Sequence, residues 1–175
     1  MYDKVNIKSL TPIHAQKLWI NVNDDAEVFL TADVNTISCI ANGKSNVELH
    51  VTAKEATYQI NENSELKGII TADTLKVDLY QKASTKLEGE VKMMQVRADN
   101  DTDFYGEKLN ATNTTLLAEG SSDCYILANE KISIEAKDKT EIYLLGEPQV
   151  DMNSFTNEAI LYKKGIDYTP SRFKL

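Results

Sequence analysis

Hydrophobic and polar residues alternate along this chain in a pattern that recurs about every nineteen residues. Each repeat opens with three mostly apolar positions spaced two residues apart, and mostly polar residues lie between them. The first column holds Leu18, Ile37, Ala56, Leu75, Met94, Thr114 and Ile132; the second holds Ile20, Cys39, Tyr58, Val77, Val96, Leu116 and Ile134; the third holds Val22, Ala41, Ile60, Leu79, Ala98, Ala118 and Ala136. Alternation with a period of two is typical of a β-strand with one buried face, so each repeat begins with a strand.

A second strand follows in each repeat after a polar turn of about five residues, such as residues 23–27 or 99–103. Asn, Asp, Gly and Ser fill these turns because they adopt turn conformations readily. The two inward columns of the second strand are predicted to hold Val28, Val47, Leu66, Leu87, Phe104, Cys124, Ile142 and Leu161, then Leu30, Leu49, Gly68, Gly89, Gly106, Ile126 and Leu144. A shorter, less regular segment completes the repeat.

This self-similarity predicts an all-β fold, a parallel β-helix or β-solenoid of seven to eight rungs with about 19 residues per rung. An antiparallel sandwich also uses short strands at this spacing, but nothing in a sandwich requires successive strand pairs to be copies of one another. We expect a single domain with its repeats in residues 15–164. Residues 1–14 and the tail, residues 165–175, break the repeat and are predicted to cover its ends.

One outward column of the second strand is dominated by tyrosine in its later half. Tyr105, Tyr125, Tyr143 and Tyr162 occupy it on four successive rungs, after Phe29, Glu48, Lys67 and Glu88 on earlier ones. Four exposed rings at strand spacing would form a ladder, which is the one candidate partner-binding face in this sequence. A platform of tyrosines offers a large amphipathic surface to a glycan or a protein partner. The alternative is that the rings only stack on one another and stabilise the sheet.

The two cysteines and two histidines give no catalytic pattern. Cys39 and Cys124 both fall in inward columns, about four rungs apart, or roughly 19 Å at strand spacing. A disulfide needs Cα atoms within about 7 Å, so both are predicted to be free, buried thiols. His14 precedes the stack and His50 takes an outward position, and neither has a Ser, Cys or carboxylate at a catalytic spacing.

The acidic run at residues 99–103 imitates the first half of a calcium-binding loop. The sixth position is Phe104 instead of glycine and the twelfth is Asn110 instead of glutamate, so the EF-hand pattern fails. Glu119 and Asp123 in the neighbouring turn leave weak binding of a divalent cation as an alternative. The sequence therefore predicts no catalytic residue, no metal site and no cofactor.

The charge of the chain narrows the classes of partner. A net charge of -8 and a pI near 4.8 produce a field that repels phosphate backbones and anionic lipids, which argues against nucleic acid and membrane surfaces. No stretch approaches the roughly 18 apolar residues of a membrane-spanning helix, and the start lacks the apolar core of a signal peptide. On residues alone, the protein is cytosolic or its leader has been removed.

Two segments carry a family resemblance: the turn Ala-Glu-Gly-Ser-Ser-Asp at 118–123 and the stretch Thr-Glu-Ile-Tyr-Leu-Leu-Gly-Glu-Pro-Gln-Val at 140–150. They resemble the small Ser-Gly turns and the closing rung of the auto-transporter adhesin head domain, or GIN domain, and the layout is similar from residue 15 to residue 164. Other turns, such as residues 42–45, depart from that pattern. The resemblance implies a right-handed, three-sided parallel β-helix, a bacterial protein of the cell envelope or the extracellular space, and no established ligand or catalytic residue.

Three hypotheses for the function of the protein are therefore consistent with the sequence. The leading hypothesis is a non-enzymatic, adhesin-like binding module that presents the tyrosine face to a glycan or protein. The second is a structural subunit that self-assembles by stacking its coils end to end. The third is a carbohydrate-active β-helix enzyme, which is disfavoured because the short turns leave no walls for a substrate cleft.

Overall fold

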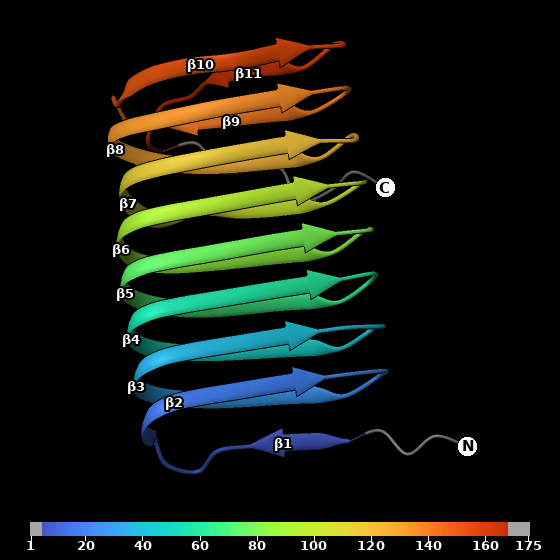
Figure 1. Cartoon of the computed structure of the whole chain (residues 1–175), viewed down its shortest axis with the longest axis vertical. Helices are drawn as coiled ribbons and strands as arrows, with labels where there is room; N and C mark the ends of the chain where they lie inside the picture. Colours follow the sequence, from blue (N-terminus) through green and yellow to red (C-terminus); the bar gives the residue numbers. More distant parts are fainter. Residues whose placement is uncertain (1–4, 168–175) are drawn as a thin grey trace.

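The alternating segments form strands that pair in parallel, each with the equivalent stretch of the next rung. A computed structural model describes residues 5–167, which build an all-strand coil of about eight rungs and contain no helix (Figure 1). The strands are β1 (Asn6–Lys8), β2 (Ile13–Val22), β3 (Glu27–Ala41), β4 (Asn46–Asn61), β5 (Glu65–Tyr80), β6 (Ser84–Asp99), β7 (Asp103–Glu119), β8 (Asp123–Lys137), β9 (Glu141–Leu145), β10 (Gln149–Thr156) and β11 (Ile160–Lys163). The predicted β-solenoid is thus confirmed.

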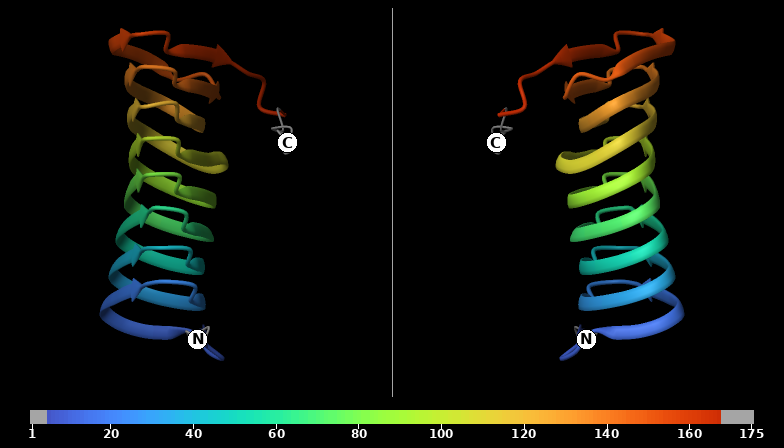
Figure 2. Two further views of the ribbon diagram at one scale, coloured as in Figure 1. Left: turned by 90° about the vertical axis from the view of Figure 1, so that its right-hand side faces the viewer. Right: turned by 90° about the vertical axis from the view of Figure 1, so that its left-hand side faces the viewer.

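Each rung follows one path around the coil. In Figure 1 the long strands cross the far face, bend at the left, return across the near face and end at a tight turn on the right. Because the chain moves rightward across the near face while it climbs, the coil is right-handed (Figure 1). The views in Figure 2 show the two faces stacked in register from the first rung to the last.

The second strand predicted for one repeat and the first strand predicted for the next are halves of one continuous strand, and the shorter segment predicted between them is part of that strand and its bend. In β3, inward side chains alternate up to Val34 and resume at Ile37, so three residues instead of two separate these buried positions. The ladder continues on both sides of this bend, with Asp33 opposite Thr52 and Thr36 opposite Glu55. The extra residue turns the chain around the corner while both halves keep their apolar side chains inside.

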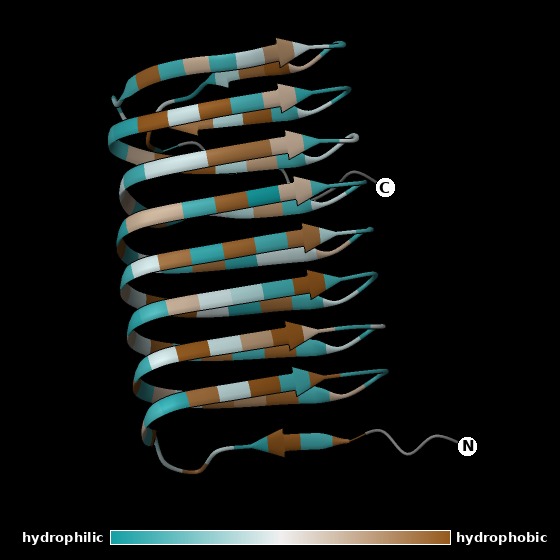
Figure 3. Ribbon diagram, in the orientation of Figure 1, coloured by the Kyte–Doolittle hydropathy of each residue, from teal (hydrophilic) through white to brown (hydrophobic). Residues whose placement is uncertain are grey.

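The three columns predicted for the first strand are confirmed by the pairing of β2 to β8. Leu18, Ile20 and Val22 begin them, and each column runs through the predicted residue of every rung. From β3 onward these side chains are almost entirely buried in one core, with Ile37 at 0% exposure and Leu75 at 0%. Figure 3 shows the resulting alternation of hydrophobic and hydrophilic residues along the near face.

The predicted columns of the second strand are wrong on one rung, β6. Thr85 lies opposite Leu66, and Leu87 lies opposite Gly68, so Leu87 and Gly89 each belong one inward position later than predicted. The outward column is displaced in the same way, and Lys86 holds the place predicted for Glu88. A shift of two residues preserves which face is buried, so the hydrophobic pattern alone cannot detect it.

Small residues line the inside of the tight turns. Ser45 and Ser64 share a hydrogen bond of 3.1 Å, and Thr102 and Ser122 share one of 3.0 Å, all four being buried. The backbone amide that follows each of these positions bonds to the carbonyl of the preceding turn, as in Glu65 N to Ser45 O at 2.9 Å. The turns therefore continue the ladder, which keeps successive rungs in register.

Both ends of the coil contain strands beyond the regular repeat. Within the predicted N-terminal cap, β1 pairs in parallel with β3 and extends the ladder by one half-rung. His14 was expected before the stack, but it lies in β2 opposite Asp33, because the ladder already begins at Ile13. At the other end β10 pairs with β8 and β11 with β9. Of the predicted tail, residues 168–175 lie outside the described residues.

Candidate functional site

The four tyrosines of the predicted outward column do stand one above another. Tyr105, Tyr125, Tyr143 and Tyr162 are paired in register across β7, β8, β9 and β11. Successive ring centroids are 5.1, 4.4 and 5.0 Å apart, and successive ring planes differ by 13°, 7° and 21°. In-register parallel strands place equivalent side chains one strand spacing apart, so identical planar rings stack face to face. We call this stack of four residues the tyrosine ladder.

Stacking covers much of each ring. Tyr125, which has a ring on either side, is only 9% exposed, and the other three are half-buried, so the expectation of four exposed rings is not met. The ring faces lie against one another, which leaves the ring edges as the aromatic surface that a partner can reach. A sugar ring therefore cannot stack on the tyrosine faces inside the ladder, because neighbouring tyrosine rings already cover them.

A column of carboxylates runs beside the tyrosine ladder. Asp103, Asp123 and Glu141 are paired in register two residues before the tyrosines, so they share the same outward face. The Tyr143 hydroxyl donates a hydrogen bond to Glu141. Burial, this hydrogen bond and the neighbouring negative charges raise the pKa of Tyr143 well above its usual value. Its hydroxyl therefore remains a protonated donor throughout the neutral range.

Lysines stand at both ends of the tyrosine ladder. Lys86 occupies the column position immediately before Tyr105. At the other end the Lys164 Nζ atom lies 5.2 Å from the Tyr162 ring centroid and 5.6 Å from the Tyr143 centroid. These distances are within the range of cation–π attraction. The aromatic column is thus bracketed by positive charge and flanked on one side by negative charge.

A bulge in β7 interrupts the face just after Tyr105. The register between β6 and β7 shifts between Lys86 and Glu88, and that between β7 and β8 shifts between Gly106 and Ala111. The extra length makes the β7 coil, yellow in Figure 2, project beyond its neighbours. Leu109 anchors the bulge in the core at 0% exposure. Bulges of this kind commonly redirect side chains beside functional surfaces.

The earlier half of the same face has a different character. A shallow groove of about 330 Å³ lies against Lys8, Phe29, Glu48 and Lys67, among other residues. The Phe29 and His50 rings meet edge-on, with their centroids 5.4 Å apart. The Lys8 ammonium lies over the Phe29 ring, 5.3 Å from its centroid. This half therefore offers alternating charges and one aromatic ring, in contrast to the continuous aromatic column above it.

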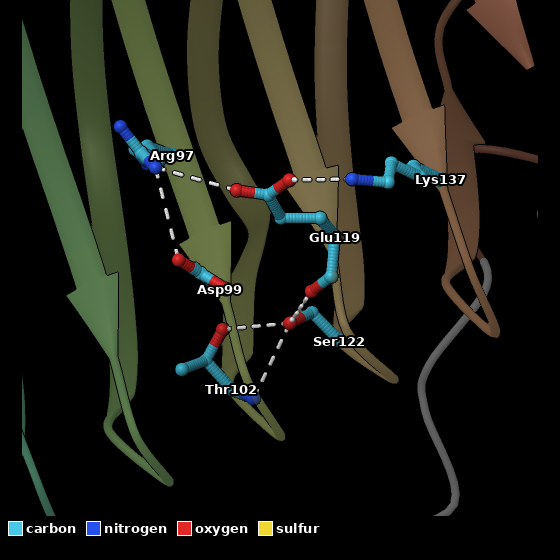
Figure 4. A network of polar contacts seen from close by, with 6 residues as sticks. All are labelled: Arg97, Asp99, Thr102, Glu119, Ser122 and Lys137. Carbon is cyan, nitrogen blue, oxygen red and sulfur yellow. Dashed lines mark hydrogen bonds and ion pairs between the residues drawn. The ribbon is translucent and has the colours of Figure 1, made fainter.

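A polar network at the tight-turn edge was not predicted from the sequence (Figure 4). The Arg97 guanidinium lies 3.3 Å from Glu119 and 3.7 Å from Asp99, and Lys137 reaches the other oxygen of Glu119 at 3.8 Å. Ser122 donates to the Glu119 carbonyl at 2.8 Å. Glu119 is 22 positions from Arg97 and 18 from Lys137 in the sequence, so only the stacking of rungs brings these side chains together. The positive and negative side chains are paired with one another, so this network is better suited to holding neighbouring turns together than to catalysis.

A second shallow groove, of about 450 Å³, follows the bend on the opposite edge of the coil. Its polar lining includes Thr71, Asp73, Lys92 and Asn110. Lys92 and Asp73 form an ion pair at 2.6 Å, and the hydrogen bond and positive charge of Lys92 lower the pKa of Asp73. Because the acid is already paired and exposed, it is not poised for proton transfer at neutral pH.

A comparison with protein families decides the class of this coil. The model described as "Putative auto-transporter adhesin, head GIN domain" matches residues 50–148, more than half of the chain. The chain belongs to this family. The matched span contains three of the four ladder tyrosines, and Tyr162 lies beyond it. No curated protein and no solved structure matches the chain.

The thiols of this GIN domain are free and buried, as predicted. Cys39 lies in β3 and Cys124 in β8, both at 0% exposure. Burial raises the pKa of Cys39 to about 12 and that of Cys124 still further above its usual value. A buried, protonated thiol is a poor nucleophile, so both behave as small apolar core residues.

The remaining candidates of the sequence are dispersed over this GIN domain. His14 Nδ1 lies 3.6 Å from Asp33, and His50 Nε2 lies 3.4 Å from Glu48, each in a solvent-exposed pair. The run at residues 99–103 forms a turn in which Asn100 has a positive φ of 63°. Within residues 5–167, no three His, Cys, Asp or Glu side chains are placed to hold a metal ion.

The family also bears on where the protein acts. The description of an auto-transporter adhesin head indicates a cell-surface or extracellular location. In the described part of the chain no helix has the length and apolar character needed to cross a membrane.

Proposed function

We propose that this GIN domain is a non-enzymatic binding module of the cell surface that engages its partner through the tyrosine ladder. The observation that carries the proposal is the unbroken stack of four tyrosines with an acidic column beside it. Other outward columns mix residue types, as in the column of Ile40, Gln59, Asp78, Arg97 and Leu117. The family description of an adhesin head supports the same role.

The ladder suits recognition because it is both amphipathic and rigid. Tyrosine edges supply apolar contact, while hydroxyls and the flanking carboxylates supply hydrogen-bonding groups. The rings are already fixed by stacking, so binding immobilises few rotatable bonds and costs little side-chain entropy. A partner lying along the coil axis, either a glycan or a protein segment, meets one tyrosine on each of the four rungs and one acid on each of the first three.

The geometry gives less support to an enzyme. Both described grooves are shallow, and the most connected set of charges, around Arg97 and Glu119, is internally paired. Catalytic sites generally require a concave pocket with a few unpaired, convergent polar groups. A binding surface requires neither.

The proposal is tested by binding of the purified protein to intact cells or to immobilised glycans. Tyr105→Ser combined with Tyr143→Ser removes two alternate rings and is expected to reduce binding at least tenfold. Tyr80→Ser is the matched control, because Tyr80 lies outside the ladder, where its ring contacts the Arg97 guanidinium at 5.5 Å. Circular dichroism establishes that both variants are folded at the assay temperature. Equal binding by the ladder variant and the control would show that the ladder serves the fold alone.

A further inference from the structure

The N-terminal end of the coil is an open strand edge. Within residues 5–167, β1 and β2 pair only with β3, so their other edges have no strand beside them. Inward side chains at this end are uncovered: Ile7 is 49% exposed, and Leu18 and Ile20 are half-buried, although later members of their columns are fully buried. Such an edge is a template for the addition of another strand.

The backbone groups at this end point outward along the coil axis. In the ladder, outward residues bond to the rung below, as shown by Asn42 N to Val22 O at 2.9 Å and Asn46 N to Ala26 O at 3.0 Å. A residue in a parallel ladder directs its amide and carbonyl to the same neighbouring strand. The outward residues Trp19 and Asn21 of β2 therefore direct theirs to the open end.

The C-terminal end is built differently. The register of β10 shifts between Met152 and Ser154, which introduces a bulge into the last long strand. Lys163 stands in the inward column opposite Leu144, where earlier rungs hold apolar residues. A bulge and an inward-pointing charge are two devices that block strand pairing at a sheet edge. The C-terminal end also exposes apolar side chains, such as Met152 at 58%, but these two devices make the N-terminal end better suited to pairing.

Charge favours the pairing of two N-terminal ends. Antiparallel alignment of β2 with itself, centred on Ile20, sets Leu18 against Val22 and Lys17 against Asn23, beside Asp24 and Asp25.

We propose that two copies of this chain associate through their N-terminal ends about a twofold axis, with the two β2 strands antiparallel. Such an isologous contact closes the assembly at a dimer, because each copy has one N-terminal end and uses it once. The contact is independent of the proposed binding role of the tyrosine ladder. It leaves both ladders uncovered toward the outer ends of the dimer, so a surface partner would be engaged bivalently.

Sedimentation equilibrium of the full 175-residue chain tests this proposal. The wild type is expected at twice its chain mass of 19.6 kDa. Leu18→Lys places a charge in the open end and is expected to give monomers. Val150→Lys is the matched control, because Val150 ends the column that Leu18 begins, and it is expected to remain dimeric.

A charge exchange tests the antiparallel alignment itself. Lys17→Glu is expected to weaken the dimer about fivefold, as for an exposed ion pair, and Lys17→Glu with Asp24→Lys is expected to restore it. If the Leu18→Lys variant does not fold, this charge exchange still tests whether the dimer forms through the N-terminal ends. A wild type that is monomeric at all concentrations, a dimer that survives Leu18→Lys, or filaments that Val150→Lys disrupts would each overturn the proposal.

Discussion

The central ring of the tyrosine ladder should matter more for stability than the terminal ring. Tyr125 stacks on Tyr105 at 5.1 Å and on Tyr143 at 4.4 Å, and it is 9% exposed. Each aromatic pair on adjacent strands contributes roughly 0.2 to 1 kcal/mol, and burial of a large side chain contributes about 1.5 to 3 kcal/mol. Tyr125→Ala should therefore lower the free energy of unfolding by about 2 to 5 kcal/mol.

The terminal ring provides the comparison. Tyr162 stacks on one neighbour, at 5.0 Å, and is half-buried, so Tyr162→Ala should cost only about 1 to 2 kcal/mol. Urea unfolding followed by circular dichroism gives both values, provided that the m-values agree. Tyr125→Phe keeps the stack and should remain within about 0.5 kcal/mol of the wild type. Equal losses for Tyr125→Ala and Tyr162→Ala would refute the claim that stacking from both sides stabilises the coil.

Three further predictions concern individual residues of the core and of the tyrosine ladder. Gly89 has a φ of 122°, and a Cβ there would meet the Ile70 carbonyl oxygen at 2.0 Å, so Gly89→Ala should destabilise by about 2 kcal/mol or more in urea unfolding. The Thr114 hydroxyl is buried without a hydrogen-bond partner, so Thr114→Val should raise stability by about 1 kcal/mol and the Tm by about 3 °C; no increase would contradict this. Burial raises the pKa of Tyr58, and it does the same for Tyr143, so the folded state keeps protons that the unfolded state loses above about pH 10. The stability that these two tyrosines contribute should be constant below that pH and fall above it, in addition to the fall from about pH 9 that the raised pKa values of Cys39 and Cys124 cause. Tyr58→Phe with Tyr143→Phe should therefore reduce, without abolishing, the fall in the urea midpoint between pH 9 and pH 11.

The sequence predicts the columns of the first strand completely because each rung repeats the same alternation at nearly constant spacing. The Thr114 position was expected to be inward despite its hydroxyl, and it is 4% exposed. The β6 rung escaped prediction because Leu87 is apolar and Thr85 is not, although Thr85 is the residue in the column and is fully buried. Alternation specifies a face, whereas only the backbone ladder specifies the register along it.

The candidate site was predictable to a similar extent. Spacing places the four tyrosines in one outward column, but their exposure depends on how the rings turn, and spacing carries no information about that. The contact between Arg97 and Glu119 spans one rung and falls at a turn, where the side chains no longer follow a strict alternation. The unequal ends depend on the inward position of Lys163 and on the bulge after Met152, neither of which a repeat pattern reveals.

The most direct test of the binding role is to replace all four ladder tyrosines by phenylalanine. Tyr105→Phe, Tyr125→Phe, Tyr143→Phe and Tyr162→Phe preserve the ring stack and remove only the hydroxyls, so the coil should remain folded with a Tm within a few degrees of the wild type. Cell-surface or glycan binding by this variant separates recognition from stability. The proposed function predicts that binding falls at least tenfold, because the ring faces are already occupied and the hydroxyls are the polar groups that the ladder presents. Wild-type binding by the stably folded phenylalanine ladder would contradict it.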